Sequence, residues 1–307
     1  MKRHVLALVL YALLTLVLAR PLVTNLNTVL AGQSSYVYTN PWAGWWTRKA
    51  LTENLHFCYT DYRYYPQGVS TVFHSFSHVN TVLSLLLTPA LGHFAAYNVC
   101  ILLAFVLSGF SMYLLVNRLT DCVPAALVAG LVFAFHPYHV FESAHPVIIT
   151  TQWMPLFALS LVQMVQGSEK VQVWQPALTG LWFILTALSS WHLMLMLGGW
   201  SALYLAYRAP SGRKDWAPGA LRSLFLTAVI VGLALSPFLW LNVKETVGSG
   251  FARMSADIDD GIGNDLLGFL IPNRRNPVLH PLASTWCEST IRQDSQESGL
   301  PIWATFQ

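Results

Sequence analysis

A stretch rich in aromatic residues near position 60 carries one carboxylate. Residues 59–68 read Tyr-Thr-Asp-Tyr-Arg-Tyr-Tyr-Pro-Gln-Gly, and Asp61 is the only acid among them. Aromatic rings can stack on the apolar faces of sugars, and a carboxylate accepts hydrogens from sugar hydroxyls. A carboxylate desolvated among rings can also act as a general base. Asp61 is therefore a candidate catalytic residue, and Tyr62, Arg63 and Tyr65 are candidate substrate-binding residues. The alternative is a turn aspartate that only contacts water.

A second stretch spaces four ligand-type side chains three residues apart, at His136, His139, Glu142 and His145. Glu142 is a second candidate catalytic carboxylate, and His139 and His145 could contact a phosphate. His136, His139 and Glu142 could instead hold a divalent cation, Mg²⁺, Mn²⁺ or Zn²⁺. Steps of three drift around an α-helix, so a regular helix would turn the first and last histidines apart, whereas a short 3₁₀ turn would align them. Ordinary surface imidazoles are the alternative interpretation.

Long apolar runs must position these residues. Of the 307 residues, 54% are hydrophobic and only 10% are charged. A helix that crosses a bilayer needs ~20 predominantly apolar residues and pairs its own backbone groups. The pattern predicts an all-α, polytopic transmembrane protein with about seven spans and a long first external loop. The predicted spans are residues 4–19, 95–116, 123–135, 149–165, 171–188, 193–207 and 224–241. The run 79–91 is short, which favours an interfacial or re-entrant helix.

The Lys and Arg residues between the runs predict the orientation. The basic pair at residues 2–3 favours a cytoplasmic N-terminus. With seven spans, Arg118 and the basic cluster at 208–222 then also lie inside, as the positive-inside rule expects. The first loop, residues 20–94, and the loop 136–150 fall outside. Both candidate carboxylates are in these two loops, so chemistry that uses them is expected on the outer face.

The first outer loop also predicts a helix at the membrane surface. Asn40 suits the N-cap of such a helix and Pro41 its first turn. Trp42, Trp45 and Trp46 follow at helical spacing, so their side chains should share one face. Tryptophan is typical of the interface between membrane and water. Trp46 is in addition a candidate substrate-binding residue.

The chain is expected to divide after the last apolar run. Residues 1–241 form the predicted transmembrane module, and residues 242–307 form a polar external segment that we expect to be truncated before further spans. The first run could be a cleaved signal peptide, but its end lacks a clean small-x-small site, which favours an uncleaved anchor. Cys58 and Cys287 both lie outside, where a disulfide could form, although unpaired thiols are the simpler interpretation. No nucleic-acid motif is present.

Several of these pieces together resemble the bacterial members of the GT-C superfamily, polytopic glycosyltransferases that use polyprenyl-phosphate sugars. The pieces are Trp-x-x-Trp-Trp at 42–46 with Arg-Lys-Ala-Leu at 48–51, Thr-Asp at 60–61 leading to Tyr-Pro-x-Gly-Val-Ser at 65–70, residues 129–138, and His145 before 151–155. The resemblance implies a multi-pass protein of the bacterial inner membrane, with the lipid bilayer and a polyprenyl-phosphate sugar as partners. Members usually carry a catalytic aspartate early in the first outer loop, whereas residues 31–38 here contain no acid.

The resemblance implies a membrane glycosyltransferase that moves a hexose or pentose, with inversion, to an acceptor on the outer (periplasmic) face. An outer-loop carboxylate, Asp61 by preference or Glu142, would deprotonate the acceptor hydroxyl. Arg63, with His139 or His145, or a divalent cation such as Mg²⁺ or Mn²⁺, would neutralise the departing phosphate. The alternative is a catalytically inactive protein of this fold with a transport or assembly role, which the missing early aspartate leaves open.

Overall fold

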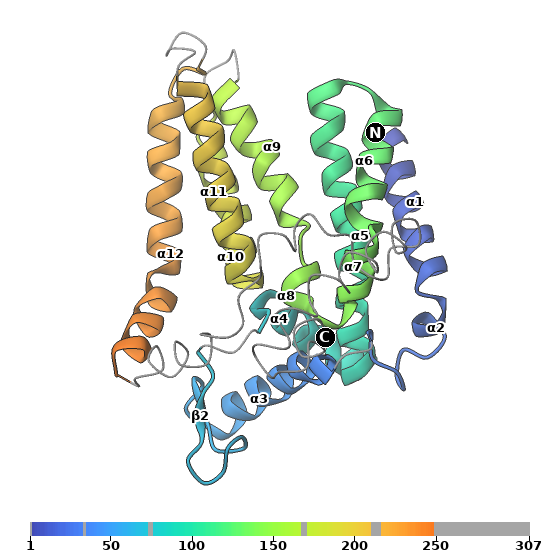
Figure 1. Cartoon of the computed structure of the whole chain (residues 1–307), viewed down its shortest axis with the longest axis vertical. Helices are drawn as coiled ribbons and strands as arrows, with labels where there is room; N and C mark the ends of the chain where they lie inside the picture. Colours follow the sequence, from blue (N-terminus) through green and yellow to red (C-terminus); the bar gives the residue numbers. More distant parts are fainter. Residues whose placement is uncertain (1, 33–34, 73–75, 167–170, 210–215, 249–307) are drawn as a thin grey trace, which may run out of the picture. The chain divides into compact units, whose positions relative to one another are not determined.

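The computed structural model describes residues 2–32, 35–72, 76–166, 171–209 and 216–248 (Figure 1). The chain divides into two compact units, Met1–Trp240 and Leu241–Gln307. The described residues are mostly helical and contain a single two-stranded sheet, which confirms the predicted helical class. All the contacts described below lie within the first unit.

The elements follow one another along the chain, and the long helices coincide with the apolar runs. They are α1 (Lys2–Leu18), α2 (Arg20–Val23), the 3₁₀ helix η1 (Ser35–Tyr38), α3 (Thr39–Glu53), β1 (Tyr59–Thr60), β2 (Val69–Ser70), α4 (His78–Leu91), α5 (His93–Thr120), α6 (Val123–Phe135), α7 (Pro137–Phe141), the 3₁₀ helix η2 (Glu142–Ala144), α8 (Pro146–Ile149), α9 (Trp153–Gln166), α10 (Gln175–Ser189), α11 (Trp191–Arg208) and α12 (Ala220–Gly248).

Within the described residues, four helical stretches are long and apolar enough to cross a membrane, so this is a membrane protein. They are His93–Thr120, Val123–Ala144, Pro146–Gln166 and Ala220–Val247. The other three predicted spans are occupied by α1, α10 and α11, which are not among the four. The count of seven spans therefore stays a prediction. The 14 residues of α4 are too few to cross a bilayer alone, and the helix packs against α5.

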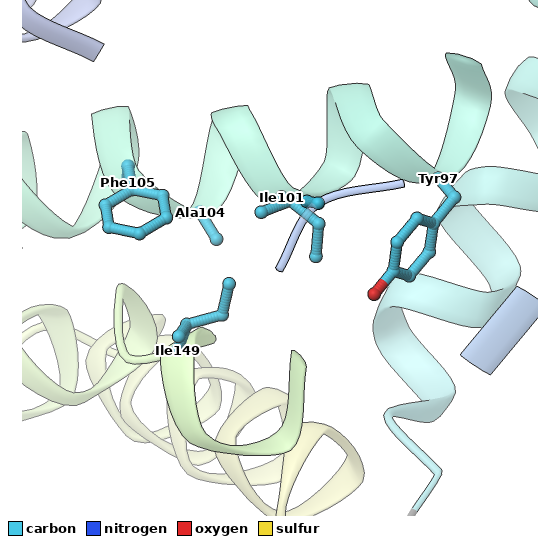
Figure 2. Packing of buried hydrophobic residues seen from close by; sticks show 6 residues of the cluster. Tyr97, Ile101, Ala104, Phe105 and Ile149 are labelled. Atoms are coloured by element: carbon cyan, nitrogen blue, oxygen red, sulfur yellow. The ribbon is translucent and has the colours of Figure 1, made fainter. Parts of the chain in front are cut away.

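The long helix α5 is the centre of the first unit, because α1, α4, α6 and α9 all pack against it. Its apolar face includes Tyr97, Ile101 and Phe105, which are buried together with Ile149 of α8 (Figure 2). This cluster fixes the short helix α8, and with it the segment between α6 and α9, against the first half of α5. On the other side of the unit, α9 packs on α10 and α10 on α11.

Two glycines allow α1 to pack closely against α5 and α6. Tyr11 of α1 is fully buried, and its hydroxyl donates to the carbonyl of Leu127 at 3.1 Å. A Cβ on Gly109 would lie 2.8 Å from the Tyr11 ring, and a Cβ on Gly130 would lie 2.5 Å from the carbonyl oxygen of Gly109. Only glycine fits at these two places, so α1 packs as an integral helix of this unit.

The connections between helices gather at two ends of the first unit. The helices α2, α3 and α4 and the β1–β2 hairpin lie toward one end, which is lower in Figure 1, and α7 and α8 lie above them on the same half of the unit. The start of α1 and the α5–α6 connection lie at the other end (Figure 1). The hairpin that carries one candidate carboxylate and the segment that carries the other are thus in the same half of the unit. Which side of the membrane this half faces stays a prediction.

The predicted N-cap of the tryptophan-rich helix is wrong. The helix α3 begins at Thr39, directly after η1, so Asn40 lies inside the first turn rather than before it. Asn40 is buried, and its Oδ1 accepts a hydrogen bond from the backbone N–H of Ser77 at 3.1 Å. Ser77 is the residue before α4, so this side chain fastens the starts of two helices together.

Candidate functional site

The candidate Asp61 lies in a hairpin that projects from α3. The strands β1 and β2 pair antiparallel, with Tyr59 opposite Ser70, and the Tyr59 hydroxyl donates to the carbonyl of Gln67 across the loop. Asp61 is exposed in this loop, and the side chain of Tyr65 at its tip is 81% exposed. The expectation that Asp61 is desolvated among rings is therefore wrong, because the neighbouring aromatic residues turn to α3 or to solvent.

The three tryptophans of α3 share one face, as predicted. The rings of Trp42 and Trp46 stack with centroids 6.1 Å apart, and Trp45 lies beside both. Trp46 is only 4% exposed, and its indole N–H donates to the carbonyl of Phe57 at 3.1 Å. Its contacts therefore hold the start of the hairpin on α3, and its ring is too buried to stack on a sugar.

Two cations lie over the aromatic rings. The guanidinium carbon of Arg63 is 4.0 Å from the centre of the Trp42 ring, and Lys49 Nζ is 5.3 Å from the ring of Tyr62. Burial lowers the pKa of Arg63, but arginine keeps its charge near neutrality. A hydrogen bond to Glu53 raises the pKa of Lys49. Arg63 is thus committed to the hairpin contact, while the side chain of Tyr62 remains 56% exposed.

The second candidate stretch folds as short helical turns rather than one regular helix. The turn η2 has 3₁₀ geometry, which sets residues three apart on the same side. Glu142 Oε2 consequently lies 2.7 Å from Nδ1 of His145, close enough for an ion pair although not aligned as a hydrogen bond. The side chains are 14% and 22% exposed, respectively. We refer to these two residues as the Glu142–His145 pair.

His139 has a different environment, although it is only three residues from Glu142. It is 3% exposed, and its two ring nitrogens contact the carbonyl oxygens of Ala134 at 2.6 Å and Ile149 at 3.0 Å. Neither nitrogen is turned toward a ligand. The side chain instead ties the end of α6 to the end of α8, so a phosphate-binding role for His139 has no support in these contacts.

The predicted metal site also lacks support. The ring of His136 stacks on that of His139, and its Nδ1 accepts the backbone N–H of His139 at 3.2 Å, which caps α7. Within the described residues, no group of three or more His, Cys, Asp or Glu side chains is arranged to hold a metal. A divalent cation held by His136, His139 and Glu142 therefore stays an untested prediction.

Buried polar contacts anchor this segment to α4 and α5. Asn80 of α4 donates to the Thr150 hydroxyl at 2.6 Å, and the hydroxyls of Ser108 on α5 and Thr151 are 2.9 Å apart. Both threonines lie in the break between α8 and α9. Buried non-helical backbone and the side chains beside it need such partners inside the protein.

The start of the loop that follows α2 packs directly on the Glu142–His145 pair. Gly32 has a φ of +101°, and a Cβ there would lie 2.5 Å from Cα of Ala144 in η2. A few residues later, the ring of Tyr36 lies 4.6 Å from that of His145. Gly32 and Tyr36, which belong to a stretch without an acid, therefore lie against Ala144 and His145, the neighbours of the Glu142 carboxylate.

A buried amide holds the beginning of this loop in place. Asn98 of α5 is fully buried, and its Nδ2 donates to the carbonyls of Leu26 at 2.8 Å and Val29 at 2.7 Å. Its Oδ1 accepts the backbone N–H of Ala31 at 3.0 Å. No sequence pattern marked Asn98, Gly32 or Tyr36 as functional. For Asn98 a signal existed, because an amide inside an apolar run must find hydrogen-bond partners.

Two sequence-based hypotheses lie outside the described residues. The first is the pairing of Cys58 with Cys287, because Cys287 lies beyond position 248. The second is the polar segment 242–307, of which only residues 242–248 are described.

Comparison with known proteins places the chain in one family. Residues 5–275 match the family described as "Domain of unknown function (DUF6311)", so the chain belongs to that family. No curated protein and no solved structure matches the chain. The family description names no activity, so the function has to be argued from the site itself.

Proposed function

We propose that this member of the DUF6311 family is a membrane glycosyltransferase of the GT-C type. It moves a sugar from a polyprenyl-phosphate donor to an acceptor hydroxyl, and the Glu142–His145 pair forms the centre of its active site. One observation carries the proposal. Glu142 lies in contact with His145, and the His145 ring lies 4.6 Å from Tyr36, in the stretch where the family that the sequence resembles keeps its acid.

The environment of Glu142 suits catalysis better than that of Asp61. Its side chain is largely removed from water and is paired with an imidazole, whereas Asp61 is exposed in the hairpin loop. Glu142 lies at the end of an apolar span, where desolvation of a carboxylate is unfavourable. Ionisable residues in such positions are usually functional. We therefore transfer the role of the missing early aspartate to Glu142 rather than to Asp61, which sequence analysis had preferred.

The hairpin offers a surface for the sugar and its phosphate. The exposed rings of Tyr62 and Tyr65 can stack on a sugar, and Arg63 supplies positive charge nearby. The hairpin lies in the same half of the first unit as η2 and α8 (Figure 1). The proposal places the end with the hairpin on the outer face of a bacterial inner membrane, with the N-terminus in the cytoplasm and the prenyl chain of the donor in the bilayer.

Two matched variants test the proposal. The purified protein in lipid nanodiscs is supplied with polyprenyl-phosphate hexoses and pentoses, and sugar transfer to acceptor alcohols is measured. Glu142→Gln should lower the rate by ~10²–10⁴-fold, the usual effect of losing acid–base catalysis, while the isosteric control Asp61→Asn should keep it within a few-fold. The reverse pattern would return the role to Asp61. A wild-type protein that transfers no sugar from any of these donors contradicts the proposal and leaves the inactive transport or assembly component.

A further inference from the structure

We infer that His145, and not Glu142 itself, takes the proton from the acceptor, with Glu142 as the residue that orients its ring. This inference rests on the proposed function and assigns separate roles to the two members of the Glu142–His145 pair. It starts from the atom that the carboxylate faces, which is Nδ1 of His145.

The geometry leaves one ring nitrogen of His145 open. Within the described residues, Nε2 of His145 has no hydrogen-bond partner, while Glu142 Oε2 is 2.7 Å from Nδ1. A carboxylate at Nδ1 favours the tautomer that carries its proton there, which puts the lone pair on Nε2. The other two histidines of this segment lack this arrangement. Both nitrogens of His139 face backbone carbonyls, and Nδ1 of His136 caps α7.

The surroundings hold the ring in one position. The backbone N–H of His145 donates to the carbonyl of Glu142 at 2.8 Å, and Pro146 follows directly, so the chain has little freedom at this point. Tyr36 lies against the ring, and Gly32 lets the first loop approach η2 closely. With 22% of its side chain exposed, His145 still has access to solvent and to a substrate.

The proposed step balances without a further reactant. The acceptor oxygen forms a bond to C1 of the sugar, and its proton moves to Nε2 of His145. The bond from C1 to the phosphate oxygen breaks, and its electron pair leaves with the polyprenyl phosphate. Glu142 stabilises the imidazolium that forms, and water takes the proton before the next turnover.

Chemical rescue separates the two roles. His145→Ala should lower the rate of sugar transfer by ~10²–10⁴-fold. Added imidazole should raise the rate of this variant at least about tenfold, because the small molecule can enter the space left by the ring. The Glu142→Gln variant still contains the His145 ring, so added imidazole should not restore its activity. The double variant Glu142→Gln/His145→Ala should be no slower than His145→Ala alone, because Glu142 acts only through His145.

The outcomes distinguish this inference from the proposed function. An active wild-type protein whose His145→Ala variant retains activity within about tenfold overturns the role of His145 and leaves Glu142 as the direct base. A wild-type protein without transfer activity overturns both proposals. A readout without substrate comes from ¹⁵N NMR of labelled histidine, with His145→Gln used to assign the signal. The neutral ring should carry its proton on Nδ1, and a proton on Nε2 would contradict the inference.

Discussion

Contacts rather than residue type decide what each histidine between α6 and α8 can do. His139 and His145 have the same side chain and lie six residues apart, yet one is buried between two carbonyls and the other is only partly buried and paired with a carboxylate. Trp46 makes the same point, since its indole N–H holds a backbone carbonyl and is not available to a ligand. A residue that suits a given chemistry is useful only if its polar atoms remain open.

Gly32 gives a prediction at the residue scale. Gly32→Ala should unfold the protein more readily, by about 2 kcal/mol or more, because a Cβ there would overlap Ala144 and push the first loop off η2. Transfer activity should fall as well, since Tyr36 would move from His145. Thermal unfolding in detergent and the transfer assay measure the two effects.

The matched control is Gly219→Ala. Gly219 also has a positive φ, +88°, but nothing lies within 4 Å of the position of its Cβ. The loss of stability in Gly219→Ala therefore measures only the strain of a positive φ in alanine, about 1 kcal/mol. Equal losses of stability for the two variants would show that the contact between Gly32 and η2 is unimportant.

At the scale of elements, α5 organises both halves of the site. Its Asn98 holds the loop after α2, and its Ser108 contacts the break between α8 and α9. In the apolar cluster of Figure 2, Ile149 of α8 packs against the same helix. The two loops therefore meet because both are fastened to one helix, and not because they are close in sequence.

Removal of the Asn98 amide should release the first loop. Asn98→Ala leaves two carbonyls and one N–H without their partner, and each unpaired buried group costs about 1–3 kcal/mol. We expect a lower unfolding temperature and faster proteolysis within residues 24–32. Asn25→Ala is the control, because the hydrogen bond from Asn25 to Pro21 is exposed and water can replace it. Similar behaviour of the two variants would rule out the clamp.

Gly130 tests the packing of α1 against α5 and α6. Gly130→Ala places a Cβ 2.5 Å from the carbonyl of Gly109 and against the hydroxyl of Tyr11, so it should destabilise the fold by about 2 kcal/mol or more. Gly198→Ala in α11 meets nothing within 4 Å and should be neutral or slightly stabilising, since alanine favours helix. Unfolding of both variants in the same detergent gives the comparison. A Gly130→Ala protein as stable as the control would mean that these helices are not in close contact.

At the scale of the whole molecule, the first unit has the hairpin, α7 and α8 in one half and the α5–α6 connection at the opposite end (Figure 1). Connections lie at both ends because successive long helices run in opposite directions, as membrane helices joined by short connections do. The proposed chemistry requires that the end with the hairpin faces outward.

Cysteine labelling in intact cells checks this orientation. An impermeant thiol reagent should label Asp61→Cys directly and Arg118→Cys only after the membrane is opened, because Arg118 lies at the end of α5 near the opposite end of the unit. Cys58, Cys122 and Cys287 are replaced by serine beforehand to remove the background. Both target residues are exposed, so poor access does not explain a negative result. Labelling at 118 but not at 61 in intact cells would invert the orientation.

The sequence alone determined the membrane character, the helical class and the positions of most helices. The reason is that a bilayer imposes a local requirement, a run of apolar residues long enough to satisfy its own backbone groups, and such runs can be recognised without knowledge of the fold. The shared face of Trp42, Trp45 and Trp46 was predictable for a similar reason, because helical spacing is a local property.

Only the tertiary structure decided which polar groups meet. The sequence favoured Asp61 over Glu142 as the catalytic carboxylate, whereas burial favours Glu142. The contact between Tyr36 and His145 joins two loops that are distant in the chain, and it depends on Gly32 fitting against η2. Three-dimensional packing decides which partner a polar side chain meets. Spacing along the chain predicts such contacts only within one helical turn. For that reason a single 3₁₀ turn was enough to bring Glu142 and His145 together, while His139, at the same spacing, was buried elsewhere.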